Sequence, residues 1–440
     1  MTSKSIKFFF QKIKNTFWHL PKNFFINLKY GFPSKKLILI GITGTDGKTT
    51  TCHLVHHVLT ASGLKAGLIS TNGAIIGNTN HQTKLHMTSP DPKIIQNLLQ
   101  KMVKEKVTHV VLEVTAHGLD QSRFLLSSFD IAAITNTSIE HLDYFKNIDQ
   151  YIKTKAKIFN QSKISILNKD DQSFDIIKPI LKNKPITFSI KNPSDYQAKN
   201  IKITNQKLQF NVNNIQIITD SPYQYQIYNI LTAFAICNQL NINPSLFVNS
   251  VKKFPQIKGR REEVKNNFKF KTIVDFAHTP AALENTLLSL KKNTQGNLIT
   301  IFGATGGRDP SKRPLMGNVV SKISNIAIIT ADDTRNEKIE DINNQIIAGI
   351  TNKNTKLVNH LNLNQRQINQ IVKDANKYFI YFNVPNRQDA FNLAIKLAQP
   401  NDTIVACGKG HEDTILHGKT EYPWSETEAF RTAFNLKTHD

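Results

Sequence analysis

The stretch Gly41–Thr51, which reads Gly-Ile-Thr-Gly-Thr-Asp-Gly-Lys-Thr-Thr-Thr, decides the fold of the chain around it. It follows the apolar run Leu37–Ile40, typical of a buried strand, and precedes residues 52–61, whose apolar positions have helical spacing. A glycine-rich turn between a strand and a helix lets backbone N–H groups approach phosphate oxygens. Lys48 can then reach the terminal phosphates, and the Thr49 hydroxyl can contact Mg²⁺. We therefore predict a phosphate-binding loop; the alternative is an ordinary glycine-rich turn that opens a helix.

Length and composition limit the class of protein. The 440 residues suffice for two or three domains, and the net charge of +23 is spread along the chain. A dispersed positive charge favours an anionic substrate over a nucleic-acid surface. The three cysteines, Cys52, Cys237 and Cys407, are far apart in sequence, which indicates a reducing compartment. No apolar run is long enough to cross a membrane, so we expect no membrane-spanning helix. We expect a cytoplasmic protein and a monomer.

Residues 1–36 differ from the rest of the chain. They contain eight lysines, nine aromatic residues and no acidic residue. A basic, aromatic, amphipathic segment can lie at the surface of an anionic membrane, here the inner membrane. The alternative is a helix that packs on the protein and keeps its lysines in solvent, and the sequence alone leaves both open.

Residues 37–255 alternate between strand and helix patterns, which predicts a doubly wound α/β domain with a mostly parallel sheet. The expected strands are Leu37–Ile42, Leu68–Thr71, His109–Val114, Ile131–Asn136 and Ile164–Asn168. Residues 198–219 alternate over short runs with Asn-rich turns, and we expect hairpins attached to the sheet.

The pair Phe254-Pro255 interrupts this pattern, and a second α/β series begins at residue 256. Its expected strands are Thr272–Phe276, Leu298–Phe302, Ile326–Thr330, Tyr378–Phe382 and Thr403–Cys407. Polar clusters follow several of these strands, and sites in open α/β sheets form beyond the carboxyl ends of strands. The predicted organisation is an N-terminal extension (1–36), a central P-loop-type domain (37–255) and a C-terminal Rossmann-like α/β domain (256–440).

Further polar residues follow the strands after the loop. Glu113 ends a buried-type strand and is placed to meet the metal of a nucleotide. Glu140, His141 and Asp143 are concentrated after the next strand, and Lys155 follows them. Each residue alone is as easily a surface group, but their order after the loop points to a nucleotide site.

These motifs together resemble the Mur ligases, the ATP-dependent amide-forming enzymes of peptidoglycan assembly. The closest branch is the UDP-N-acetylmuramoyl-tripeptide synthetases, which add the third amino acid. The resemblance runs from about residue 37 to the end of the chain. The motifs that carry it are Gly44–Thr50, Thr88–Pro92, Glu113–Arg123, His141–Tyr144, Asp275–Glu284, Gly303–Asp309 and Gly408–Glu412.

The resemblance assigns roles by position. Catalytic roles fall on Lys48, Glu113, His141 and Lys155. The implied ATP contacts are Gly44, Thr45, Asp46, Gly47, Lys48, Thr49, Thr50 and Asn229. The implied contacts to the muramoyl substrate are Thr88, Ser89, Thr115 and Arg123. The implied Mg²⁺ ligands are Thr49, Glu113, His141 and Lys155, the last as a carbamate, since an ammonium cannot bind a cation. Lys157 is the second candidate for this modification.

The incoming amino acid would be read by Arg308, Asp332, Asp333, Arg335, Gly408 and Glu412. An arginine suits the distal carboxylate of meso-diaminopimelate, so Arg335 favours that substrate. Asp333 stands where the diaminopimelate-adding enzymes have Asn, and its negative charge argues against diaminopimelate as the substrate. L-lysine or another diamino acid therefore stays open.

The resemblance implies an ATP- and Mg²⁺-dependent ligase that extends a muramoyl-dipeptide nucleotide by way of an acyl phosphate. The family usually has a first domain that holds the UDP group, and residues 1–36 are expected to stand in its place, which leaves the recognition of UDP open. Two other functions compete: a folylpolyglutamate synthetase-like ligase on the same scaffold, and a membrane-tethered nucleotide-binding scaffold. No nucleic-acid partner is expected.

Overall fold

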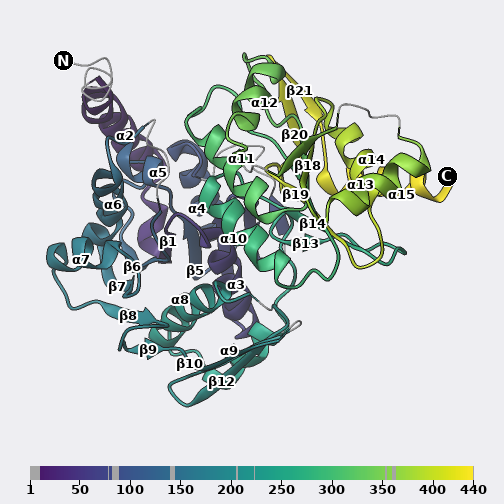
Figure 1. Ribbon diagram of the computed structural model, residues 1–440. Helices are drawn as coiled ribbons and strands as arrows, with labels where there is room; N and C mark the ends of the chain where they lie inside the picture. Colours follow the sequence, from purple (N-terminus) through teal and green to yellow (C-terminus); the bar gives the residue numbers. More distant parts are fainter. Residues whose placement is uncertain are drawn as a thin grey trace. The chain divides into compact units, whose positions relative to one another are not determined.

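The computed structural model describes residues 10–77, 79–81, 89–138, 144–204, 207–221, 223–351, 354–358 and 363–439. The chain divides into two compact units, Met1–Pro255 and Gln256–Asp440. Figure 1 colours the first unit from purple to teal and the second from green to yellow.

The first unit is built on one large sheet. Across the described residues its strand order is β4-β3-β2-β5-β1-β6-β7-β8-β9. The strands β2, β5, β1, β6, β7, β8 and β9 are paired in parallel, and β3 and β4 extend one edge in antiparallel pairing. The bounds are β1 Ile38–Thr43, β2 Ala66–Ser70, β3 Gly73–Ile76, β4 Thr79–His81, β5 His109–Glu113, β6 Phe129–Ile134, β7 Ser162–Asn168, β8 Ile186–Ser189 and β9 Tyr196–Gln197.

Helices cover both faces of this sheet, which is why its central strands are apolar throughout. In β1, Ile40 and Ile42 pack with the helices α3 (Lys48–Ala61), α8 (Gln226–Gln239) and α9 (Pro244–Lys252). Leu39 points to the opposite face and packs in a second core. The helical elements that follow the remaining strands are α4 Pro92–Lys104, α5 Ala116–Asp120, α6 Ile148–Ala156, η3 Lys157–Gln161, α7 Ser173–Ile177 and η4 Lys178–Ile180.

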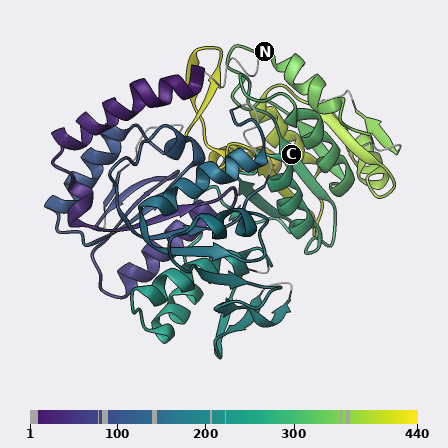
Figure 2. The ribbon, with the colours of Figure 1, turned by 90° about the vertical axis from the view of Figure 1, so that its left-hand side faces the viewer.

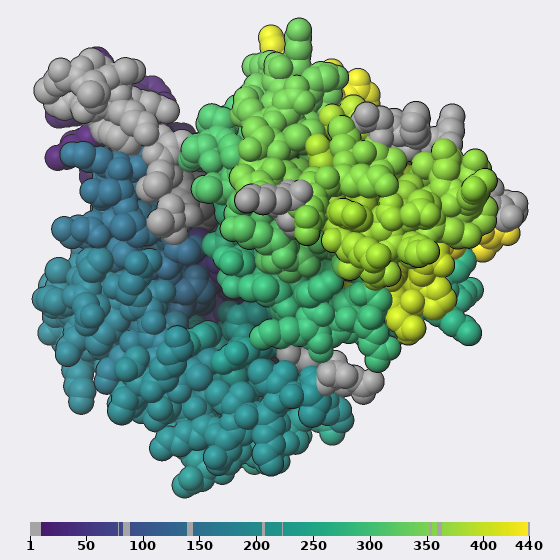
Figure 3. All heavy atoms as spheres, in the orientation of Figure 1, coloured from purple at the N-terminus to yellow at the C-terminus, as the bar shows by residue number. Residues whose placement is uncertain are grey.

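Residues 198–219 form a separate antiparallel sheet of β10 (Lys199–Ile203), β11 (Leu208–Val212) and β12 (Ile215–Thr219). The hairpins expected here are present, but they pair with one another and not with the large sheet. Phe210 and Ile217 are buried and join the core that contains α8 and α9. The teal side chains of this region form the lower rim of the first unit in Figure 3.

Residues 10–29 form one continuous helical segment on the outside of the first unit, drawn purple in Figure 2. Its middle, η1 (Asn15–His19), is a π-helix, and its last part is α2 (Leu20–Lys29). Gly31 follows with φ 68°, a conformation that glycine adopts without steric cost, and the segment η2 (Pro33–Lys36) leads into β1.

The second unit has the strand order β13-β14-β19-β15-β16-β18-β17 in the described residues. All neighbours are parallel except β13, which is antiparallel to β14. The bounds of the strands are β13 Glu262–Glu263, β14 Lys271–Asp275, β15 Leu298–Phe302, β16 Ile326–Ile329, β17 Thr355–Leu357, β18 Phe379–Asn383 and β19 Thr403–Cys407. The helices are α10 Pro280–Lys291, α11 Lys312–Ile323, α12 Ile339–Ile347, α13 Gln365–Asp374, α14 Arg387–Leu397 and α15 Glu426–His439. A hairpin of β20 (Thr414–His417) and β21 (Thr420–Pro423) precedes α15.

The predicted α/β class with mostly parallel sheets is confirmed. None of the helices in the described part of the chain combines the length and apolar character that a membrane span requires.

Candidate active site

The loop between β1 and α3 takes the shape expected for phosphate binding. Gly44 and Gly47 have φ of 146° and 80°, where other residues are strained. A Cβ on Gly44 would collide with Thr135, and a Cβ on Gly47 would collide with Asn229. Both glycines are therefore required by conformation and by space, and the loop ends at the N terminus of α3, where unpaired N–H groups favour anions.

The end of β6 holds this loop in place. Thr45 N donates to the carbonyl oxygen of Asn136 at 2.9 Å, and Asp46 N donates to the Asn136 side chain at 2.9 Å. The Asp46 carbonyl oxygen accepts hydrogen bonds from Thr135 Oγ1 at 2.7 Å and from Asn136 Nδ2 at 3.1 Å. Lys48 folds back over the loop and donates to the Thr45 carbonyl oxygen at 2.8 Å. Thr135 and Asn136 were not predicted as site residues, because only the fold brings β6 beside β1.

Thr49 and Glu113 meet beside the first turn of α3. Thr49 Oγ1 donates to Glu113 Oε1 at 2.9 Å, and both side chains are buried. The other carboxylate oxygen of Glu113 accepts from Thr71 N and Thr71 Oγ1 at 2.8 and 2.9 Å. The pair is a compact set of oxygen donors of the kind that Mg²⁺ prefers. Thr71 is a further polar contact that the sequence did not reveal.

Lys155 reaches the same loop from α6. Its side chain is 1% exposed, and Nζ donates to the Gly44 carbonyl oxygen at 2.6 Å. Nζ also lies 4.4 Å from the centre of the Tyr151 ring, and the Tyr151 hydroxyl is 3.3 Å from Thr45 Oγ1. Lys157, the second candidate for modification, instead pairs with Asp120 at 2.9 Å. The structure therefore places Lys155 at the phosphate loop and Lys157 away from it.

Asn229, expected near the adenine, is buried against Gly47. Its Nδ2 donates to Gln226 Oε1 at 3.0 Å, and Thr51 Oγ1 donates to its Oδ1 at 3.5 Å. This placement shows how Asn229 supports the loop from α8. Its contact with ATP stays a prediction.

Three of the residues expected to contact the muramoyl substrate lie together. Thr115 Oγ1 donates to Ser89 Oγ at 2.9 Å and caps α5 by accepting from Gly118 N at 3.1 Å. Arg123 Nη1 donates to the Ser89 carbonyl oxygen. Burial lowers the pKa of Arg123, with Asp91 acting in the opposite direction. The predicted residues Thr88, Glu140, His141 and Asp143 lie outside the described residues. In the described part of the chain, no three His, Cys, Asp or Glu side chains gather as a metal site.

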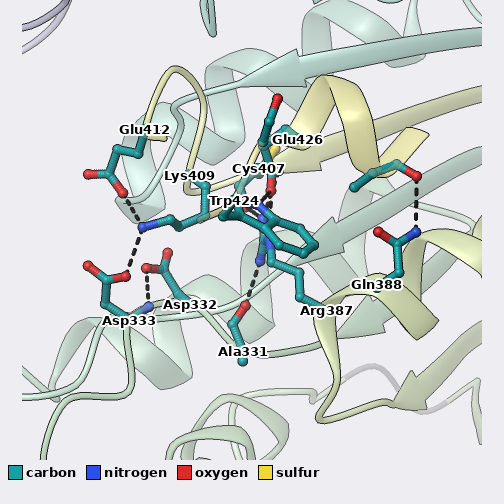
Figure 4. A network of polar contacts seen from close by, with 12 residues as sticks. Ala331, Asp332, Asp333, Arg387, Gln388, Cys407, Lys409, Glu412, Trp424 and Glu426 are labelled. Carbon is teal, nitrogen blue, oxygen red and sulfur yellow. Dashed lines mark hydrogen bonds and ion pairs between the residues drawn. The ribbon is translucent and has the colours of Figure 1, made fainter. Parts of the chain in front are cut away.

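In the second unit, polar groups gather where β16 and β19 end (Figure 4). Lys409 is fully buried; its Nζ donates to Asp333 Oδ1 at 2.8 Å and to Glu412 Oε2. Asp333 Oδ1 also accepts from Leu416 N at 2.9 Å, so it ties this cluster to β20. Gly408 is held against the Asp332 carboxylate, which a Cβ at this position would strike.

Three carboxyl groups therefore surround one lysine ammonium. Burial raises the pKa of Glu412 to about 7, although Lys409 opposes this rise. Asp332 is also disfavoured as an anion by burial, but Lys409 and Arg387 hold its pKa below the usual value. Lys409 loses hydration on burial, yet Asp332, Glu412 and Asp333 raise its pKa. The extra charge of Asp333, which the sequence suggested would repel a dicarboxylate substrate, is thus paired with Lys409 within the protein, although Lys409 also serves Glu412 and Asp332.

A second buried ion pair supports this cluster. Arg387 donates from Nε and Nη2 to the two Glu426 oxygens at 2.8 and 2.9 Å (Figure 4). Its remaining hydrogen bonds go to the carbonyl oxygens of Ala331 at 2.7 Å and Cys407 at 3.0 Å. Arg387 therefore joins the ends of the strands that carry Asp332 and Gly408. This pair was not predicted from the sequence, because its members come from separate helices.

The two predicted arginines lie at the edge of the same cluster. Arg335 is half-buried in the left-handed conformation (φ 52°) and its side chain lies over Gly307. Its Nε is buried and makes no hydrogen bond within the described residues. Arg308, next to Gly307 in sequence, is exposed.

Comparison with known proteins identifies a family for each of the two units. Residues 42–237 match the Mur ligase middle domain, and residues 259–410 match the Mur ligase, glutamate ligase domain. The UDP-N-acetylmuramoyl-L-alanyl-D-glutamate–2,6-diaminopimelate ligase 1 of Clostridium acetobutylicum is 34% identical over 91% of this chain and 78% of its own length. The corresponding ligase of Bacillus cereus is 32% identical over 96% of this chain and 82% of its own length.

Solved structures show the same fold. A structure of a UDP-N-acetylmuramoyl-L-alanyl-D-glutamate–2,6-diaminopimelate ligase has a TM-score of 0.60 and 26% identity, covering 92% of this chain and 79% of that one. A bifunctional folylpolyglutamate synthase/dihydrofolate synthase from Yersinia pestis has a TM-score of 0.65 at 17% identity, covering 89% of this chain and 92% of that one. This second likeness shows a shared fold alone.

Proposed function

The chain belongs to the Mur ligase family, and we propose that it joins meso-2,6-diaminopimelate to UDP-N-acetylmuramoyl-L-alanyl-D-glutamate in an ATP-dependent step of peptidoglycan synthesis. The relatives that carry this activity in their names match almost the whole chain and support this substrate pair. The structural observation that carries the proposal is the Thr49–Glu113 pair beside a glycine loop, with Lys48 and Lys155 on the same loop.

The proposed reaction has two steps. The free carboxylate of the muramoyl dipeptide first accepts the terminal phosphoryl group of ATP, ADP leaves, and the carboxylate becomes an acyl phosphate. The amine of the incoming amino acid then attacks the acyl carbon, and inorganic phosphate leaves as the amide forms. Positioning and charge neutralisation are the main contributions that a protein makes to the first step.

We assign the first step to the first unit. Lys48 is the cation of the phosphate loop, and the N terminus of α3 adds the positive end of a helix dipole. Ser89, Thr115 and Arg123 form the cluster that we assign to the muramoyl substrate. By their positions in the sequence, we also assign His141 to the metal ligands and Thr88 to the muramoyl cluster.

Mg²⁺ would neutralise phosphate charge in this site. Thr49 and Glu113 fit such an ion because both present buried oxygen donors at one point. Lys155 does not fit as an ammonium, but its carbamate would supply two anionic oxygens. The buried Lys155 amine donates to the carbonyl oxygen of Gly44 in the glycine loop, so a carbamate on it would lie beside the phosphates that we assign to this loop.

We assign the incoming amino acid to the cluster in the second unit. Arg335 and Arg308 would bind carboxylates, because an arginine forms two parallel hydrogen bonds with such a group. Asp332, Glu412 and the backbone at Gly408 would lie near the ammonium groups. Since Asp333 forms an ion pair with Lys409, the carboxylate that stands in place of Asn argues less strongly against diaminopimelate.

The proposal is tested by giving the purified protein ATP, the muramoyl-dipeptide nucleotide and a panel of amino acids, and analysing the products by mass spectrometry. Diaminopimelate should be the preferred acceptor; a preference for glutamate on a folate would support the folylpolyglutamate alternative. Lys48→Ala should lower phosphate release by roughly a hundredfold or more, since it removes a preorganised cation. Lys104→Ala, an exposed lysine of α4, is the matched control. Amide synthesis that survives Lys48→Ala unchanged would refute the enzyme assignment.

In the cell we expect a cytoplasmic monomer.

A further inference from the structure

The helical segment of residues 10–29 is attached to the first unit through polar groups. Asn23 Nδ2 donates to the carbonyl oxygens of Gln121 and Ser122, both at 2.9 Å. Asn15 Nδ2 donates to Asp120 Oδ2 at 2.6 Å, on the same side of α5. The helix is therefore anchored to the end of α5 by amide hydrogen bonds.

The polarity of this segment is the reverse of an ordinary surface helix. The side chains that it buries against the protein are Asn23 and Asn27, which are 1% and 0% exposed. The side chains that it turns to solvent are large and apolar, with Phe17 77% and Phe25 65% exposed. Ile13, Trp18, Phe24 and Leu28 are exposed as well. A surface helix normally buries its apolar stripe, so this exposed one indicates a contact outside the chain.

Charge identifies the partner. Lys12, Lys14 and Lys29 are exposed on the same segment, and residues 1–36 contain no acidic residue. A protein partner that matched this face would need an apolar groove lined by acids, whereas an anionic bilayer offers both features at once. Tryptophan and phenylalanine among lysines are also the residues that sit at the boundary of headgroups and acyl chains.

We propose that the outer face of residues 10–29 docks onto the surface of an anionic lipid bilayer. The helix lies in the plane of the interface, its aromatic side chains enter the headgroup region, and its lysines contact lipid phosphates. About twenty helical residues span roughly 30 Å, which gives the apolar face room for several aromatic anchors.

Docking through this face has a consequence for the ligase that rests on the proposed function. Asn23 contacts residues 121 and 122, and Arg123 of the predicted muramoyl cluster follows them directly. Lys22 pairs with Asp91, two residues after Ser89 of the same cluster. The membrane-bound helix would therefore hold the substrate cluster close to the bilayer. The docking itself needs no ligase activity, so its test is independent of the enzyme assay.

The test is sedimentation of the full-length protein with phosphatidylcholine vesicles, with and without phosphatidylglycerol. We expect binding to the anionic vesicles only, and weaker binding as salt is added, because screening reduces lysine–lipid attraction. Phe17→Ser with Phe25→Ser should weaken binding at least roughly tenfold, since two interfacial anchors are lost. The matched control is Ile180→Ser with Ile203→Ser, which replaces two exposed apolar residues elsewhere on the first unit.

The charge component is tested separately. Lys14→Glu with Lys29→Glu should also reduce binding by roughly tenfold or more, and Lys252→Glu with Lys253→Glu, exposed at the end of α9, should not. Trp18 reports contact directly, because vesicles should blue-shift the emission of the wild type and leave Trp18→Phe unchanged. Equal binding by the aromatic variant and its control would overturn the proposal. So would a dimer in sedimentation equilibrium that the aromatic variant abolishes without any vesicle binding, which would make this face an interface between two copies.

Discussion

Lys155 donates a hydrogen bond of 2.6 Å to the carbonyl oxygen of Gly44, a residue 111 positions earlier in the chain. The contact joins the last turn of α6 to the glycine loop, and it buries an amine beside the loop that we assign to ATP. The amine also lies 4.4 Å from the centre of the Tyr151 ring. Because it is held beside the loop that we assign to ATP, a carbamate formed on it would be placed to meet a metal ion there.

Carbamylation of Lys155 is therefore the first prediction. In bicarbonate enriched with carbon-13, NMR should detect a carbamate resonance in the wild type and none in Lys155→Arg. Lys157→Arg is the matched control and should keep the resonance, since Lys157 pairs with Asp120 away from the loop. A resonance that is lost in Lys157→Arg and kept in Lys155→Arg would contradict the prediction, because it would place the carbamate on Lys157.

Glu113→Gln should raise the Mg²⁺ concentration needed for half-maximal phosphate release by about tenfold or more, because it removes the anionic oxygen donor beside Thr49. Thr71→Val should have a smaller effect in the same direction, since it removes one hydrogen bond from a carboxylate that keeps its charge. Titration of Mg²⁺ at saturating ATP measures both. An unchanged magnesium requirement in Glu113→Gln would exclude this residue as a ligand.

Arg335→Ala should raise the KM for diaminopimelate by roughly tenfold to a hundredfold, because a charged hydrogen-bonding partner of a carboxylate is lost. The kcat should change less, since the distal carboxylate of diaminopimelate lies away from the reacting amine. L-lysine, which lacks the distal carboxylate, should be used about as poorly by the variant as by the wild type. Equal losses with both amino acids would show that Arg335 does not read the distal carboxylate.

Glu412 should make the stability of the protein depend on pH. Burial raises its folded-state pKa to about 7, above the ordinary value of 4.5, so the folded state binds the proton more tightly than the unfolded state. The stabilisation is complete below pH 4.5 and is lost as pH rises towards and through about 7. Between these limits the loss is on the order of 1–3 kcal/mol, allowing for partial exposure of the side chain.

The measurement is the free energy of unfolding of the wild type and of Glu412→Gln at several pH values. The variant should lose less stability than the wild type as pH rises from 5 to 8. Other titrating groups, such as His56, whose pKa is lowered by burial, are common to both proteins and cancel in the comparison. Parallel pH profiles would show that Glu412 stays charged in the folded protein throughout this range.

Much of the fold follows from the local pattern of the sequence. The strands β1, β5, β15 and β19 lie within two residues of their predicted positions, because each is a mostly apolar run buried on both faces. The strands β7 and β14 are placed as closely, although each is apolar and buried over only part of its length. The short strands β8, β9 and β17, which lie at or next to an edge of their sheets, were not predicted. They contain few apolar residues, and their pairing depends on a neighbouring strand that is distant in sequence.

The site was predictable to the extent that its residues stand in one motif. The loop glycines, Thr49 and Glu113 follow from strand ends, and the structure brings Thr49 and Glu113 into contact. The partners that hold these residues, such as Thr71 and Asn136, come from other strands and carry no local signal. The same holds for Lys409, which stands in a recognised motif but whose ion pair with Asp333 depends on a contact across 76 residues.

Hydrogen bonds from the end of β6 connect the glycine loop to the segment that follows β7. Thr45 N donates to the carbonyl oxygen of Asn136, and Thr45 Oγ1 accepts from Ser138 N at 3.1 Å. The glycine loop is therefore hydrogen-bonded to the chain that leaves β6. Thr137 extends this connection by donating from N and Oγ1 to Asp171 at 2.8 and 2.7 Å. A nucleotide that displaced Thr45 would have to break these bonds or drag residues 136–138 along with it. The end of β6 thus links the glycine loop directly to the turn that follows β7, where Asp171 lies.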